Sequence, residues 1–164
     1  NFFTRTRDRL WGVILAVLGT GFAVTAILEG GFGTLAGSYL VNSLVTALGI
    51  GAISMMGLGL STLFGTMGYY GAALSMMLIG NPLSSLGGAP EMLPAGWGAF
   101  GQHLPPGAFG TLMRSVSYFD GQGATYPLVI LSAWVVTGFA LVLVGAGKQR
   151  AKRRAEAAEQ VVSV

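Results

Sequence analysis

The sequence predicts an all-α membrane protein, and three observations support this. Of the 164 residues, 52% are hydrophobic and only 9% are charged, whereas a soluble domain carries about 25% charged residues. The charges gather near the two ends of the chain, and long uncharged blocks lie between them. These blocks have the lengths of one or two bilayer-crossing helices of about 20 residues. We therefore expect a single transmembrane domain over residues 1–164, with four transmembrane helices and two short outer amphipathic helices before the last span.

The first uncharged block, Trp11–Leu28, predicts a span at about 11–28. It follows a basic arm, so a cleaved signal peptide is the alternative interpretation. Its 18 apolar or small residues exceed the usual signal-peptide core of about 7–15 residues, which favours a span. The chain begins with Asn1 instead of Met, and we therefore expect it to be a piece of a longer protein or a processed form.

The second block, Leu35–Ile79, has 45 residues, which suits two spans joined by a tight turn. A single helix of that length would be about 67 Å long, more than twice the thickness of the hydrocarbon core. Several glycines between Gly57 and Gly68 offer the break. The sequence therefore predicts spans at about 35–57 and 60–80, with the turn as the least defined boundary.

The third block, Pro127–Ala146, predicts the last span at about 127–146, followed by a basic tail over 147–164. Four crossings return the chain to the side on which it began. Lys and Arg are retained in the cytoplasm, and both ends of the chain are basic. We therefore expect a multi-pass protein of the cell (plasma) membrane with both termini cytoplasmic and the segment 81–125 outside. A three-span arrangement would separate the basic ends and is disfavoured.

Small and polar residues in the second and third spans predict how the helices pack. Gly57, Ser61 and Gly65 recur at four-residue spacing, a pattern that lets membrane helices approach closely. We expect these two helices to lie close together, or to dock on another subunit. Asn42 is the strongly polar side chain of the early second span. We interpret it as an interhelical hydrogen-bonding residue, with a contact to substrate as the alternative.

The outer segment contains the prolines and aromatic residues that predict two short helices. Pro94 suits the first turn of a helix, Pro105 and Pro106 end that helix and begin the next, and Gly121 suits the position just past its end. Apolar residues recur at three- and four-residue spacing in each helix, which indicates one apolar face. The two faces comprise Trp97, Phe100 and Leu104, and then Phe109, Leu112, Met113 and Val116.

Three charged residues and one aromatic residue are candidate functional positions on the outer side. Arg114 and Asp120 are six residues apart and do not share a helix face. Asp120 is expected to cap or turn the helix end. Arg114 is expected to face lipid headgroups or a carboxylate such as Glu29, with direct handling of cargo as the alternative. Trp97 is expected to anchor the segment at the membrane interface.

The outer segment also resembles part of a known family. The matching residues are Leu93-Pro94, Trp97, Leu104-Pro105-Pro106-Gly107, Arg114 and Tyr118-Phe119-Asp120-Gly121, followed by a last span and a basic tail. This pattern resembles the C-terminal membrane half of type-2 ABC exporter permeases, above all their phage-infection-protein-like branch. The resemblance is close over about 30 residues and loose over the four-span layout. It implies that the chain supplies spans three to six of a six-span domain.

The residue types argue against an enzyme. The chain has no cysteine, so it forms neither disulfides nor thiolate metal sites. His103 has no Glu or Cys at ligand spacing, and no GxxxxGK[ST] phosphate-binding loop occurs. The spans lack the ionisable residues that an intramembrane enzyme needs. We expect no catalytic, cofactor or metal site and no nucleic-acid partner.

We therefore expect an integral membrane permease-like subunit, part of an exporter that moves a hydrophobic or envelope-related substrate by alternating access. The resemblance implies a homo- or heterodimer of such subunits in the lipid bilayer. A cytoplasmic ATPase, where ATP drives transport, would be a separate chain. The alternative is a non-transporting membrane scaffold or receptor of the same fold. The basic tail is expected to bind anionic lipid headgroups.

Overall fold

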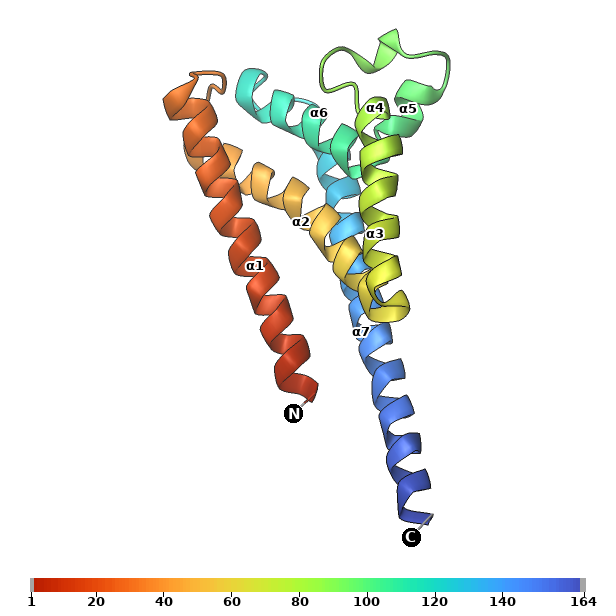
Figure 1. Cartoon of the computed structure of the whole chain (residues 1–164). Helices are drawn as coiled ribbons and strands as arrows, with labels where there is room; N and C mark the ends of the chain where they lie inside the picture. The colour runs from red at the N-terminus through yellow and green to blue at the C-terminus, as the bar shows by residue number, and fades with distance from the viewer. Residues whose placement is uncertain (1, 163–164) are drawn as a thin grey trace.

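The computed structural model describes residues 2–162, and every regular element within that range is helical. Three helices in the described part are long and apolar enough to cross a membrane: Leu10–Gly31, Tyr39–Phe64 and Thr125–Glu156. The predicted all-α class is therefore confirmed, and the three candidate spans indicate a multi-pass membrane protein whose outer faces contact lipid. Figure 1 shows the second of these helices running obliquely from the first toward the third, with short helices gathered at one end of the molecule.

The first helical hairpin joins two of the candidate spans. α1 (Phe2–Ala26) continues into the π-helical turn η1 (Ile27–Gly31), and α2 (Tyr39–Phe64) returns antiparallel to it (Figure 1). The two helices approach closely at Gly21, where an added Cβ would lie 2.8 Å from the backbone nitrogen of Ala47. A glycine at this point therefore lets the two backbones pack against each other.

The reversal after α2 occurs at Gly65, within the expected Gly57–Gly68 range but beyond the predicted end of the span at residue 57. Gly65 has φ +65° and ψ −149°, a conformation that is essentially restricted to glycine. The predicted span 60–80 is not among the three candidate spans, because α2 takes up its first residues and the helix after Gly65 is shorter and less apolar. That helix comprises α3 (Thr66–Ser75), the π-helical turn η2 (Met76–Gly80) and α4 (Asn81–Leu83).

The last helix, α7 (Thr125–Val162), has 38 residues, which corresponds to about 57 Å at 1.5 Å per residue. The basic tail is thus a continuation of this helix, and residues 163–164 of the predicted tail lie outside the described residues. The side chains of the N-terminal basic arm, Arg5, Arg7 and Arg9, also lie outside them. In Figure 1 the N-terminal end of α1 and the C-terminal end of α7 lie at the same end of the molecule.

The close crossing of α2 with α7 depends on two glycines. A Cβ added at Gly138 would lie 2.5 Å from the carbonyl carbon of Met55, and one added at Gly59 would lie 2.6 Å from the carbonyl oxygen of Gly138. The expected stripe Gly57, Ser61 and Gly65 was predicted to face the next helix, and an added Cβ at Gly57 would indeed be 3.5 Å from the ring of Tyr69 in α3. Away from the hairpin turn, the tightest backbone approach of α2 is therefore to α7, and not to the next helix in the chain.

Two short helices form in the predicted outer segment, but the first begins at Trp97 and not near Pro94, because Gly96 before it is left-handed, with φ +86°. They are α5 (Trp97–Gly101) and α6 (Pro105–Tyr118), preceded by the short 3₁₀ turn η3 (Pro90–Met92). We call residues 84–124 the outer cap. In Figure 1, α6 extends across the molecule from the side of α4 and α5 toward the loop between α1 and α2. The core cluster lies between α2, α6 and α7 and comprises Val45, Ala52, Ala108, Leu112, Met113 and Leu131.

Candidate functional site: an apolar cleft and an outer cap

Three adjoining hollows follow the side of α1 that faces the rest of the bundle, and Val13 lines all three. One lies between α1, α2 and α7 and has a volume of about 290 Å³. The next lies between α1 and the α2–α3 hairpin, with about 300 Å³. The last lies beside the Gly65 turn, with about 770 Å³. We call these three hollows, which share Val13, the α1 cleft.

The wall of the α1 cleft changes in chemistry along its length. The hollow against α7 is lined by aliphatic side chains, Met55 and small residues. The hollow beside the Gly65 turn also contains Ser61, Tyr69 and Gln149. None of the residues that line the three hollows is charged. The cleft therefore suits a ligand with a long apolar part and a small polar end.

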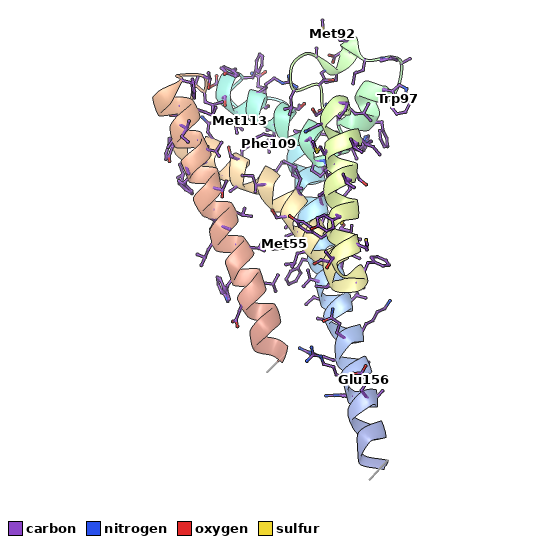
Figure 2. The ribbon with its side chains drawn as sticks, viewed as in Figure 1. Met55, Met92, Trp97, Phe109, Met113 and Glu156 are labelled. Carbon is purple, nitrogen blue, oxygen red and sulfur yellow. The ribbon has the colours of Figure 1, made fainter. Side chains whose placement is uncertain are left out.

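Helix α6 packs on α2 beside this cleft. The ring of Phe109 lies against Gly49. A Cβ added at Gly49 would be 2.5 Å from Cδ2 of Phe109. Leu48 lines the hollow against α7 and also packs on the core cluster that α6 completes. Figure 2 shows Phe109 and Met113 on α6, with Met55 further along α2 toward the Gly65 turn. The α1 cleft thus ends against the core at the side of the outer cap.

Asn42, one of the predicted site residues, joins α2 to α6. Its side chain is fully buried. Its Nδ2 donates to the carbonyl oxygen of Ala36 at 2.9 Å, and its Oδ1 accepts from Ser117 Oγ at 3.0 Å. The hydroxyl of Thr46 donates to the backbone carbonyl of Asn42 at 2.8 Å. It also shares a hydrogen bond of 3.1 Å with the hydroxyl of Thr25 in α1. This chain of hydrogen bonds connects α1, α2 and α6.

Pro105, Pro106 and Gly107 form the corner between α5 and α6. Leu104 is extended, with φ −92° and ψ 148°, as a residue before proline prefers. Both prolines are buried in the first turn of α6, where a missing N–H costs nothing. A Cβ at Gly107 would collide with the carbonyl oxygen of Gly101. Only glycine therefore allows the two helices to meet at this corner.

The charged candidates and Trp97 lie apart from one another. Nη1 of Arg114 donates to the carbonyl oxygen of Gly88 at 2.9 Å, and within residues 2–162 it does not form the expected ion pair with Glu29. Glu29 is half-buried in η1, and its Oε2 is shielded without a hydrogen-bond partner. Asp120 is exposed, with φ +50°, in the turn after α6. Trp97 begins α5 and is 53% exposed.

The eight predicted residues do not meet in one pocket, and none of them lines the α1 cleft. Five of them lie in α6 or against it: Asn42, Pro105, Pro106, Gly107 and Arg114. Sequence reasoning missed the cleft because its wall is built from ordinary apolar and small residues. Tyr69, which lines two of the hollows, lies in the first turn of α3, and a tyrosine at the end of a membrane helix is ordinary, so it gave no distinct signal.

Comparison of the chain with protein-family models, with curated proteins and with solved structures found no match. Its function is therefore inferred from the cleft, the outer cap and the arrangement of the helices.

Proposed function

We propose that the chain is a permease-like subunit of an exporter that moves a hydrophobic or envelope-related substrate across the cell membrane by alternating access. The α1 cleft is the observation that carries this proposal. It lies between the candidate spans, its wall has no charge, and its more polar part lies beside the Gly65 turn. Such a wall favours an amphiphile that enters with its polar end at the turn.

The proposal includes a four-pass topology with both termini cytoplasmic. The helical stretch from Thr66 to Leu83 is about 27 Å long at 1.5 Å per residue, close to the hydrocarbon thickness. It runs antiparallel to α2 and would be the remaining crossing (Figure 1). The basic residues of α7, from Lys148 onward, then lie on the cytoplasmic side, as the positive-inside rule favours. The Gly65 turn lies on that same side.

The outer cap acts in this proposal as the external gate. Helix α6 connects the α1–α2 hairpin, through Asn42, to the α4–α5 side of the molecule. Movement of α1 against the rest of the bundle would open the cleft, because α1 is the least buried of the candidate spans. The protein carries out no covalent chemistry itself. A second permease subunit and a separate cytoplasmic ATPase would complete the exporter, in keeping with the resemblance to type-2 ABC permeases.

Release of a fluorescent amphiphile from cells tests the proposal. Native cells that carry the complete exporter, loaded with dansyl-labelled undecanoic acid, are expected to release the probe faster than the same cells from which this chain has been deleted. Val13→Trp should remove this difference, because the indole fills the point shared by the three hollows. Gly71→Phe is the matched control, since an added Cβ at Gly71 meets nothing within 4 Å and the residue is not part of the cleft.

Equal probe release with and without the chain, at normal levels of the protein in the membrane, would contradict transport of amphiphiles. That result would favour the non-transporting scaffold or receptor. A Val13→Trp variant as active as the wild type would leave the α1 cleft without a role in transport.

A further inference from the structure

Arg114 is a cation with unused hydrogen-bond donors in the outer cap. It is the only Lys or Arg between Arg9 and Lys148. A guanidinium has five N–H donors, and the one bond it makes in the structure goes to the Gly88 carbonyl. The side chain is half-buried, and no carboxylate among the side chains that the structure describes pairs with it. It therefore presents a fixed positive charge and several free donors.

A cavity of about 500 Å³ has Gly88, the hydrogen-bond partner of Arg114, in its wall. Its wall is formed by the loop after α4, including Ser84, Ser85, Gly87 and Gly88. Gly88 belongs to the wall, and its carbonyl oxygen accepts the hydrogen bond from Arg114, so the guanidinium is bonded to a residue of the wall. The small residues leave the space open, and the wall contains no charged side chain.

Ser85 supplies a second donor without a partner. Its Oγ is buried and makes no hydrogen bond, and its backbone has φ +52°, which is uncommon outside glycine and asparagine. The neighbouring Ser84 is fully occupied, since its Oγ donates to the Asn81 carbonyl at 2.6 Å and accepts from Leu86 N–H at 3.4 Å. An unsatisfied buried hydroxyl requires an explanation. Ser85 lines the cavity, and a rotation of its side chain about χ1 would let this hydroxyl donate to a ligand there.

We propose that Arg114, Ser85 and the loop at Gly87–Gly88 form a site for a phosphate group. An arginine fork matches phosphate oxygens in charge and geometry, and free hydroxyl donors suit the remaining oxygens. A metal cation does not fit, because no group of three metal-ligating side chains occurs in the described residues. The carboxylate of the same loop, Glu91, is exposed. This site does not depend on the proposed transport function.

The position of the site favours the phosphate of a phospholipid headgroup, and free phosphate has the same chemistry. Trp97, Tyr118 and Tyr126 are 53%, 55% and 51% exposed at the same end of the molecule as Arg114. Exposed Trp and Tyr at the end of membrane spans lie at headgroup level. The cavity is therefore at the depth at which lipid phosphates are found.

Native mass spectrometry of the full chain released from nanodiscs tests the site. Wild-type protein is expected to retain phosphatidylglycerol in preference to galactosyl diacylglycerol, which has no phosphate. Arg114→Gln should lower the retained phosphatidylglycerol about ten-fold, as expected for the loss of charge-assisted hydrogen bonds. Gln122→Ala, at an exposed position of the outer cap and outside the cavity wall, is the matched control and should leave this preference unchanged. Excess inorganic phosphate displaces the lipid if the site also accepts the free anion, and leaves it bound if the site requires a headgroup.

Ser85→Ala separates a binding role from a structural one. The serine hydroxyl has no partner, so its removal should not lower the melting temperature of the lipid-free protein. Retention of phosphatidylglycerol should still fall, by about three-fold for one neutral hydrogen bond. If Arg114→Gln fails to fold, lipid retention by Ser85→Ala alone tests whether the site binds phosphate. Wild-type lipid retention in Ser85→Ala, together with wild-type retention in any folded Arg114→Gln protein, would overturn the proposal.

Discussion

Gly138→Leu is expected to prevent the chain from reaching its folded state. Already a Cβ at this position would lie 2.5 Å from the carbonyl carbon and 2.6 Å from the next backbone nitrogen of α2, at Met55 and Met56. Backbone atoms inside a helix cannot move aside as a flexible side chain does. Overpacking costs about 1–3 kcal/mol where neighbours can adjust, and we expect more than that here. The measurement is thermal unfolding in detergent, followed by circular dichroism at 222 nm, a wavelength that reports roughly on helix content.

Gly147→Leu provides the matched control on the same helix. Gly147 is exposed and an added Cβ meets nothing within 4 Å. Leucine also has the higher helix propensity, by about 0.8 kcal/mol. The control should therefore unfold at the wild-type temperature or slightly above it. Equal melting of the two leucine variants would show that α2 and α7 do not cross at Gly138.

Asn42→Ala is expected to destabilise the protein by about 2 kcal/mol. The alanine removes the donor to the Ala36 carbonyl and the acceptor for Ser117 Oγ, and the second of these bonds is buried. The second of these bonds links α2 to α6, so its loss should loosen the outer cap. The measurement is the midpoint of unfolding in detergent. Asn81→Ala is the matched control, because Asn81 is exposed and should change stability by less than about 0.5 kcal/mol.

A double-mutant cycle with Ser117→Ala isolates the bond between α2 and α6. Interhelical hydrogen bonds in membrane proteins contribute about 0.6 kcal/mol on average and up to about 1.7 kcal/mol. We expect a coupling in this range between Asn42 and Ser117. Strictly additive effects of the two substitutions would mean that the hydrogen bond does not stabilise the cap.

The position of α6 explains why one irregular segment lies between uniformly apolar helices. At the N-terminal end of α6, Pro106 packs against Gly80 of η2. A Cβ added at Gly80 would lie 3.1 Å from Cγ of Pro106. At its C-terminal end, Ser117 binds Asn42, and the hydroxyl of Tyr118 donates to the carbonyl of Thr34 in the loop between η1 and α2. A helix that contacts both hairpins can hold the outer ends together while the other ends separate. The α1 cleft lies on that other side.

Long helices and short cap helices were predictable because their signals are local. An uncharged block as long as Trp11–Leu28 has the length and composition of a membrane helix, and few other structures suit it. In the outer cap, Pro105-Pro106 marks the start of α6. The apolar residues at spacings of three and four mark the side of α6 that packs on the core. The turn was predictable only as a range, because several glycines can adopt the conformation found at Gly65.

Helix partners and the cleft were not predictable from the sequence, because both depend on contacts between distant segments. Gly59 and Gly138 are individually ordinary glycines, and only the folded chain shows that they face each other. The partner of Arg114 is a backbone carbonyl, at Gly88, which no residue pattern marks. The α1 cleft is a space between surfaces, so its signal in the sequence is weak.

Cysteine labelling from the two sides of the membrane tests the four-pass arrangement most directly. The chain has no cysteine of its own, so single cysteines can be introduced at exposed positions. Met92 in the outer cap is 82% exposed, and Met67, next to the Gly65 turn, is 81% exposed. A membrane-impermeant maleimide is expected to label Met92→Cys in intact cells, and Met67→Cys and Ala155→Cys only after permeabilisation. Labelling of Met67→Cys and Met92→Cys from the same side would show that the helix between them does not cross the membrane, and would contradict the proposed topology.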